Sequence, residues 1–205
     1  MERRAVSTVS TVSTVGAWGG LSRRAAWLGT VIVVAGVLAA PALAQPPVQT
    51  AGKATVRLVD QAGLDAEISR HAGKVVVVDC WSTSCPPCVK EFPRLVALQK
   101  THGERIACIS FSLDYEGIDA PEELLPPVQA FLDKVGAGGI VNLLCTEESD
   151  AVYRKLDLVS VPAVYVYGPD GKLAQRFDED DAAKRLKRPF TYDDVEGVVG
   201  RLVGK

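Results

Sequence analysis

Short apolar runs and amphipathic segments alternate along the chain from residue 54 onward. The apolar runs predict strands at 54–60, 74–81, 105–115, 140–148 and in both arms of a hairpin across 161–177. Apolar residues at helical spacing predict helices at 62–74, 86–103, 121–136, 149–157 and 191–203. Strands that alternate with helices, followed by a hairpin and a closing helix, predict an α/β fold in which helices flank a central mixed sheet.

Three of these segments carry local signals that define the fold further. The run "KVVVVDCW", 74–81, is apolar at consecutive positions, as in a strand covered on both faces, so we interpret it as the central strand. Pro93 lies inside the helix that follows and predicts a kink, because proline removes one backbone donor. Thr191 is placed to cap the closing helix.

The first 44 residues differ in character from the rest. Four Arg residues precede an apolar stretch, and Ala42-Leu43-Ala44 supplies the small residues that a signal peptidase reads. This order predicts a secretory signal, with a mature chain that begins near Gln45. An uncleaved membrane anchor is the alternative, because residues 25–44 are uncharged over about the length that spans a bilayer. Either reading exports residues 54–205, with 45–53 as a linker.

Composition limits the remaining possibilities. The chain has 205 residues, of which 47% are hydrophobic, enough for one ordinary core but marginal for two. The formal net charge is −2, and no basic cluster follows the N-terminal segment, so nucleic acid is excluded as a partner. Five cysteines occupy positions 80, 85, 88, 108 and 145. An odd number cannot be fully paired within one exported chain.

The segment "VVVVDCWSTSCPPC", 75–88, concentrates the candidate chemistry. A strand that ends before a C-x-x-C motif at a helix start brings Cys85 and Cys88 to the same helix end. We expect Cys85 to attack a partner disulfide as the thiolate and Cys88 to resolve the mixed disulfide. Pro86 and Pro87 lack backbone N–H groups, so we infer that backbone hydrogen bonds stabilise the Cys85 thiolate less than in a motif with one proline.

With "SVPAVYVYGPDGK" some seventy residues later, "DCWSTSCPPC" resembles thioredoxin-fold proteins. "CPPCVKEFP" and the added helix and strand around 128–145 resemble the exported TlpA/ResA-like thiol-disulfide oxidoreductases in particular. The resemblance covers roughly residues 55–205. It implies that Asp79 moves the proton of the resolving cysteine, that Glu91 tunes the thiols and that Pro162 is a cis-proline beside the dithiol. Desolvation at the end of an apolar strand agrees with this role for Asp79, because it raises a carboxyl pKa.

The same resemblance implies which residues contact the substrate, and at two positions this sequence departs from the usual thioredoxin pattern. We expect Trp81 to pack beneath the motif, and we assign substrate contacts to Trp81, Pro86 and Val161. Ser84 replaces the aromatic residue that usually precedes the nucleophile, and Cys80 replaces a usual phenylalanine. Small buried apolar side chains are the favoured interpretation of Cys80, Cys108 and Cys145, with a Cys108 to Cys145 disulfide as the alternative.

The sequence therefore predicts an exported thiol-disulfide oxidoreductase that acts as a reductase on protein disulfides. It implies a membrane thiol donor and no cofactor, with anchoring through the N-terminal segment as an option. A periplasmic copper chaperone is one alternative, although His71 and His102 do not complete a metal-ligand spacing. A binding module with a structural disulfide is another. A peroxidase would need its own peroxidatic cysteine motif, and the sequence contains none.

Overall fold

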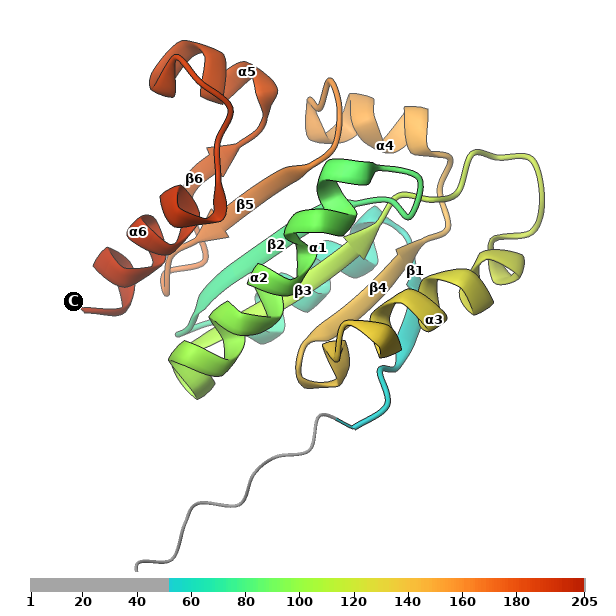
Figure 1. Cartoon of the computed structure of the whole chain (residues 1–205), viewed down its shortest axis with the longest axis horizontal. Helices are drawn as coiled ribbons and strands as arrows, with labels where there is room; N and C mark the ends of the chain where they lie inside the picture. Colours follow the sequence, from blue (N-terminus) through green and yellow to red (C-terminus); the bar gives the residue numbers. More distant parts are fainter. Residues whose placement is uncertain (1–51, 205) are drawn as a thin grey trace, which may run out of the picture. The chain divides into compact units, whose positions relative to one another are not determined.

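A computed structural model describes residues 52–204 (Figure 1). The predicted signal or anchor segment, 1–44, and most of the predicted linker lie outside the described residues. The strands are β1 (Val56–Val59), β2 (Val75–Trp81), β3 (Ile106–Ser112), β4 (Val141–Cys145), β5 (Ala163–Tyr167) and β6 (Leu173–Phe177). The helices are α1 (Gln61–Arg70), α2 (Pro86–His102), α3 (Leu125–Lys134), α4 (Ser149–Leu156), α5 (Glu179–Asp181) and α6 (Tyr192–Val203). Each strand and helix predicted from the sequence is therefore present.

The six strands form one mixed sheet in the order β1-β4-β3-β2-β5-β6. Strands β1, β4, β3 and β2 run parallel, and β5 and β6 complete the sheet in antiparallel pairing. Helix α3 and strand β4 fall in the region around 128–145 where the resemblance to TlpA/ResA-like proteins predicts an added helix and strand, and β4 lies between β1 and β3. Strand β2 lies inside the sheet and every one of its residues is buried, which confirms it as a central strand.

Helices cover both faces of the sheet (Figure 1). Along β2 the side chains alternate, with Val75, Val77 and Trp81 in one apolar cluster and Val76, Val78 and Cys80 in the other. Helices α2, α3 and α6 contribute to the first cluster, and α1 and α4 contribute to the second. Asp79 belongs to the same side of β2 as Trp81, so the strand period directs its carboxylate toward α2 and α6.

The three remaining cysteines are buried free thiols. Cys108 belongs to the cluster under α2, α3 and α6, whereas Cys80 and Cys145 belong to the cluster on the opposite face. Because the sheet separates Cys108 from Cys145, the alternative of a disulfide between them is wrong. Burial raises the pKa of the Cys145 thiol to about 11 and raises that of Cys80 and of Cys108 well above its usual value, so all three stay protonated at neutral pH.

Helix α6 is fixed at its start by a capping box. Thr191 is the N-cap, and the Asp194 carboxylate accepts the Thr191 backbone N–H at 2.9 Å. Arg188 donates to both oxygens of the same carboxylate, at 2.7 and 2.8 Å, and this ion pair holds the pKa of Asp194 well below its usual range. The sequence prediction of a Thr191 cap is confirmed.

The segment between β6 and α6 was not predicted as structured. It forms α5 and then a π-helical turn over Ala182–Leu186. Buried Asp178 begins it, because its carboxylate accepts the Asp181 backbone N–H at 2.8 Å and pairs with Arg176 of β6. Residues 178–191 thus form a structured segment near the end of the sheet where the C-x-x-C motif lies.

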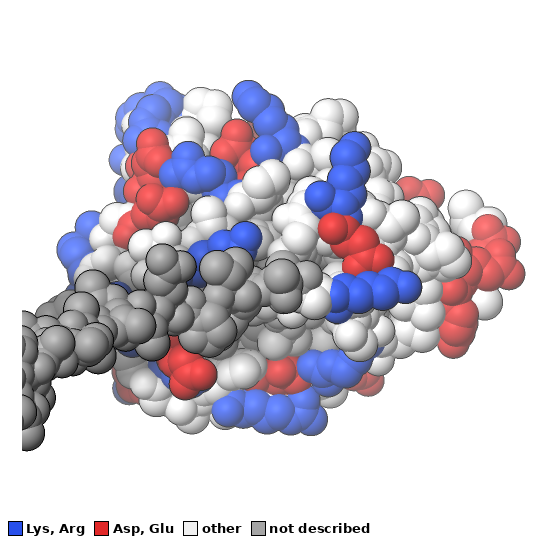
Figure 2. Space-filling model, turned by 60° about the horizontal axis from the view of Figure 1, so that its bottom comes forward, with Lys and Arg blue, Asp and Glu red and all other residues white. Residues whose placement is uncertain are grey.

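The described surface is chemically mixed. On the face shown in Figure 2, Lys and Arg side chains lie among Asp and Glu side chains without forming one continuous basic patch. Within residues 52–204, no helix combines the length and the apolar character needed to cross a bilayer.

Candidate active site

Cys85 and Cys88 form a disulfide at the N-terminus of α2. Cys85 is the N-cap of the helix and Cys88 lies one turn inside it, as the sequence predicted. Cys85 is half-buried, whereas Cys88 is 3% exposed. Because attack on a partner disulfide needs an accessible sulfur, Cys85 is the candidate nucleophile and Cys88 the candidate resolving residue.

Few backbone groups donate to the Cys85 sulfur. The Cys88 N–H donates to Cys85 Sγ at 3.3 Å, and the carbonyl oxygen of Val161 lies 3.7 Å from the same sulfur. Pro86 and Pro87 occupy the first two helical positions and have no N–H to offer. An N-cap side chain normally accepts from the second or third helical N–H, so Pro87 removes one of these two donors.

A test of this effect is to restore the missing donor at each proline in turn. We expect Pro87→Ala to lower the pKa of the reduced Cys85 thiol by about one unit, the effect of one hydrogen bond to a charged group. Pro86→Ala is the matched control, because a donor at the first helical position does not point at the cap side chain and should change the pKa less. Thiolate absorbance at 240 nm against pH measures both, and an unchanged or raised pKa in Pro87→Ala would contradict the inference.

The loop before Cys85 is held by one carboxylate. Asp114, after β3, accepts hydrogen bonds from the Ser82 hydroxyl at 2.9 Å, the Thr83 backbone N–H at 2.8 Å and the Thr83 hydroxyl at 2.5 Å. Ser84, the departure from the usual aromatic residue, bonds Ser82 through its hydroxyl at 2.8 Å. Together with Cys85, Ser84 lines a cavity of about 410 Å³, so this side of the nucleophile is polar.

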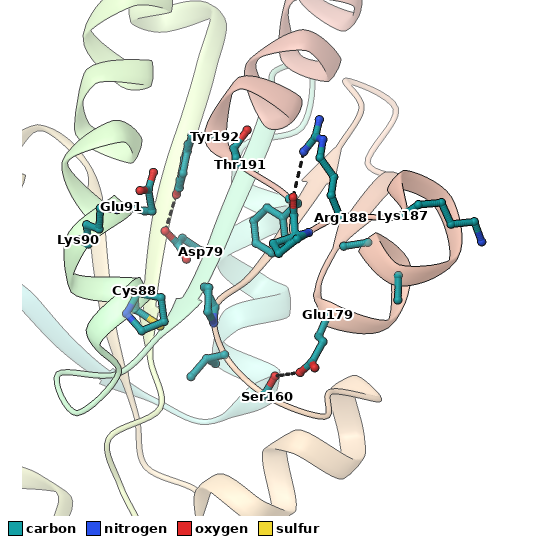
Figure 3. Close-up of a pocket in the computed structure, with 17 residues that line it drawn as sticks. Asp79, Cys88, Lys90, Glu91, Ser160, Glu179, Lys187, Arg188, Thr191 and Tyr192 are labelled. Carbon is teal, nitrogen blue, oxygen red and sulfur yellow. Dashed lines mark hydrogen bonds between the residues drawn. The ribbon is translucent and has the colours of Figure 1, made fainter.

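Pro162 follows a cis peptide bond after Val161, which confirms the predicted cis-proline. Val161 lines both the cavity beside Cys85 and a second, larger cavity of about 840 Å³ that Cys88 and Pro162 line. The larger cavity lies between α2, the cis-proline segment and the structured segment 178–191 (Figure 3). The two sulfurs therefore border different cavities, with Val161 and Cys85 in direct proximity.

Asp79 lies in the larger cavity together with Cys88. Its side chain is 4% exposed, and burial raises the pKa of this carboxyl to about 7, although a hydrogen bond from Tyr192 opposes the rise. The sequence prediction of a desolvated carboxyl with a raised pKa is confirmed. A group with this pKa exists in both protonation states near neutral pH, as a proton acceptor for a thiol requires.

Of the other predicted site residues, Glu91 and Pro86 have exposed surface, whereas Trp81 has none. Glu91 lies one turn after Cys88, half-buried, and lines the larger cavity (Figure 3). Pro86 is exposed beside Cys85. Trp81 has no exposed surface and packs against Phe92 and Phe131, each with ring centroids 4.8 Å from its own. The prediction that Trp81 contacts substrate is therefore wrong, because its side chain supports the motif from beneath.

Tyr192 is a site residue that the sequence analysis missed. Its hydroxyl donates a hydrogen bond to Oδ2 of Asp79, and both side chains are buried (Figure 3). One signal could have indicated it. Tyr192 shares the helical spacing of Val195 and Val199, so it falls on the apolar face of the closing helix and points into the core.

The sheet order, the disulfide at the start of α2 and the cis-proline beside it define a thioredoxin-fold protein with a C-x-x-C site. The model of the AhpC/TSA family matches residues 47–176, and the chain belongs to this family. The thioredoxin-fold prediction is confirmed, and both findings agree with the resemblance to TlpA/ResA-like proteins.

Several solved structures are similar to this chain at low sequence identity. A thioredoxin-like superfamily protein has a TM-score of 0.50 at 15% identity and covers 67% of this chain and 85% of its own. A thiol-disulfide isomerase of Corynebacterium glutamicum has a TM-score of 0.49 at 18% identity, covering 67% and 86%. A secreted disulfide oxidoreductase of Mycobacterium tuberculosis has a TM-score of 0.48 at 18% identity, covering 65% and 86%. At 15% identity, the likeness to the first of these structures shows the fold alone.

Proposed function

We propose that this protein is an exported thiol-disulfide oxidoreductase that reduces disulfides of other proteins with the Cys85/Cys88 dithiol. One observation carries the proposal: an accessible cysteine and a buried cysteine form a disulfide at a helix N-terminus, and the buried one shares a cavity with a desolvated carboxyl group. A structural disulfide needs no such acid, whereas the resolving step of dithiol exchange has to remove a proton from the second thiol.

The exchange has two steps. The Cys85 thiolate attacks one sulfur of the substrate disulfide, which forms a mixed disulfide and releases the first substrate thiolate. Cys88 then gives its proton to the Asp79 carboxylate and attacks Cys85 Sγ, which forms the observed Cys85–Cys88 bond and releases the second substrate thiolate. The two substrate thiolates take up protons. Two electrons pass from the dithiol to the substrate, so a thiol donor must reduce the protein again.

The helix start supports the reducing direction. A dithiol becomes oxidising when its reduced form is stabilised, for example by donors around the thiolate. Here Pro87 removes a backbone donor, and the Cys88 N–H is the backbone donor on Cys85 Sγ among the described residues. A thiolate with little stabilisation favours the disulfide form of this protein and hence electron transfer to the substrate.

The remaining site residues take supporting roles in this proposal. Val161 borders Cys85 and places its backbone carbonyl beside the sulfur, directly before the cis-proline Pro162, where an extended substrate segment can align. Pro86 offers exposed surface next to the nucleophile. Glu91 adds a second carboxyl to the cavity that Cys88 and Asp79 share and so influences the charge around the resolving thiol.

The sequence supports export, whereas the electron donor is inferred from the proposed reaction. The signal-like order of residues 1–44 supports export, either as a cleaved chain or as an anchored one, and 54–205 then acts as one thioredoxin-like domain outside the cytoplasm. The M. tuberculosis relative is described as secreted. Because the proposed reductase needs electrons on that side, we infer a membrane protein with a reactive thiol pair as the donor.

The copper chaperone and the structural disulfide are less well supported. Within residues 52–204, no group of three or more His, Cys, Asp or Glu side chains is arranged to hold a metal ion, so Cys85 and Cys88 lack further ligands there. A structural disulfide does not account for the buried Asp79 carboxyl in the cavity that Cys88 also lines. These alternatives predict no catalysis of disulfide exchange.

Turnover of a protein disulfide tests the proposal. The purified protein, supplied with dithiothreitol, should accelerate the reduction of insulin well above the rate with dithiothreitol alone, because the dithiol is regenerated in every cycle. The rate should depend linearly on protein concentration. A rate equal to that with the reagent alone, with Cys85 and Cys88 fully reduced, would contradict the proposed function.

A further inference from the structure

One hydrogen bond joins the candidate proton acceptor to the closing helix. The Tyr192 hydroxyl donates to Oδ2 of Asp79, although 113 residues separate the two in the chain. Tyr192 is 3% exposed and Asp79 is 4% exposed, so water competes little for this contact. Within the described part of the chain, Oδ1 of Asp79 accepts no hydrogen bond, and the carboxyl lines the cavity that Cys88 also lines (Figure 3).

The position of Tyr192 is fixed from two sides. Tyr192 directly follows the N-cap Thr191, whose capping box with Asp194 sets where the helix begins. Arg94 of α2 donates to Asp193 at 2.5 Å and to Glu196 at 2.9 Å, so α6 is tied to the helix that carries Cys88. The phenol therefore reaches the Asp79 carboxyl as part of a constrained structure and not as a freely rotating side chain.

We propose that Tyr192 is a positioning residue of the exchange reaction, whose hydroxyl holds one oxygen of Asp79 so that the other remains free toward the cavity and the Cys88 thiol. The inference rests on the proposed function and adds the residue that orients its proton acceptor. A donor that holds Oδ2 prevents the carboxyl from turning away from the cavity. It also stabilises the deprotonated form, which is the form that accepts a proton.

The Tyr192 phenol neither gives nor takes a proton in the exchange reaction. Cys88 loses its proton to Oδ1 of Asp79 as the Cys88 to Cys85 sulfur bond forms and the bond from Cys85 to the substrate sulfur breaks. Tyr192 keeps its proton throughout, since burial and the neighbouring Asp79 charge raise its pKa well above the usual range. The proton on Asp79 then leaves through the cavity to solvent or to the departing substrate thiolate.

Other ionisable groups also face the Asp79 carboxyl. The cavity that Asp79 lines is also lined by Cys88, Lys90 and Glu91 of α2, by Glu179 of α5, by Lys187 and Arg188 of the following segment and by Tyr192 of α6. Cys108 of β3 lies on the same face of the sheet as Asp79. Cys80 directly follows Asp79 along β2. Among the described residues, Tyr192 donates the hydrogen bond to the carboxylate, so removing this hydroxyl changes the acid while the other groups stay.

Tyr192→Phe tests the inference by removing the donor and keeping the ring. We expect the Asp79 midpoint, followed by the ¹³Cγ shift in ¹³C-aspartate-labelled protein, to rise by about one pH unit, the effect of one lost hydrogen bond to a charged group. Because less deprotonated Asp79 is then present at a given pH, the midpoint of the acid limb of the exchange rate should shift to higher pH by the same amount. Asp79→Asn assigns the resonance.

Tyr165→Phe is the matched control. Tyr165 is also buried and also loses a hydroxyl hydrogen bond, to the Leu156 carbonyl at 3.1 Å, but it lies in the cluster on the opposite face of the sheet. It should leave both midpoints unchanged. Unshifted midpoints in Tyr192→Phe, with active wild-type protein, would overturn the role of Tyr192 alone, whereas inactive wild-type protein would overturn the proposed function.

A wild-type measurement keeps the inference testable if Tyr192→Phe does not fold. The ¹³Cζ resonance of Tyr192 should titrate with the same midpoint as Asp79, because the phenol loses a charged acceptor when the carboxylate is protonated. This inflection should disappear in Asp79→Asn. A Tyr192 resonance that shows no inflection at the Asp79 midpoint would contradict the inferred contact.

Discussion

Cys85→Ser should abolish reduction of a protein disulfide, with a loss of at least about a thousandfold, because the variant lacks the attacking sulfur. Cys88→Ser should behave differently. It retains the accessible Cys85 but cannot resolve the mixed disulfide, so we expect a stable covalent adduct between Cys85 and a substrate thiol. Mass spectrometry of the non-reduced protein measures the adduct, and insulin turbidity measures the activity.

The control for cysteine loss is Cys145→Ala. Cys145 is a buried free thiol in the cluster on the opposite face of the sheet from the site, so its removal should leave the exchange rate unchanged. The assignment of Cys85 and Cys88 would be reversed if Cys85→Ser, and not Cys88→Ser, accumulated the adduct. It would be refuted if both variants kept wild-type turnover.

Asp79→Asn should slow the exchange and stabilise the fold in the same protein. The rate loss should be about a hundredfold near neutral pH, the usual contribution of a positioned proton acceptor. The acid limb of the rate against pH should also disappear, because the group that titrates at about 7 is gone. Stopped-flow mixing of reduced protein with a disulfide substrate, across pH 5 to pH 9, measures both effects.

The stability effect has a definite sign. Burial raises the pKa of Asp79 from an ordinary value near 4 to about 7, so the folded protein binds the proton more tightly than the unfolded chain does. The stabilisation from the protonated form is complete below pH 4 and is lost as the pH rises through 7. Asn cannot ionise, so between pH 4 and pH 7 the free energy of unfolding of Asp79→Asn should rise relative to that of the wild type by an amount on the order of 4 kcal/mol.

Urea unfolding of the oxidised proteins at pH 4 and pH 8 measures this difference. Asp65→Asn is the control, because Asp65 is an exposed carboxyl on α1 and should give no change with pH comparable to that of Asp79→Asn. A wild-type protein that gains stability relative to Asp79→Asn between pH 4 and pH 8 would show that Asp79 is not a destabilised, buried acid.

Much of the fold could be predicted because its signals are local. The continuous apolar run of β2, the amphipathic face of α2 and the Thr191 cap each arise from neighbouring residues, and they have the predicted structure. The Cys85 N-cap and the Pro162 cis bond were also predictable, the first from helix-start chemistry and the second from the resemblance to thioredoxin-fold proteins.

The parts that were missed depend on distant contacts. Nothing in the local sequence pairs Tyr192 with Asp79, because that contact requires α6 to pack beside β2. Residues 178–191 lack an apolar period, and their order comes from Asp178 and Arg188, which contact β6 and α6. The resemblance to thioredoxin-fold proteins implied a substrate contact for Trp81, but packing against Phe92 and Phe131 removes its side chain from the surface.

The reduction potential of the Cys85/Cys88 pair tests the central claim most directly. Equilibration of the protein with dithiothreitol buffers, followed by thiol alkylation and mass spectrometry, gives the fraction oxidised at each poise. A reducing dithiol predicts a reversible two-electron transition near that of thioredoxin, about −270 mV. A transition as oxidising as about −120 mV, or a disulfide that no buffer in this range reduces, would contradict the account of a protein disulfide reductase.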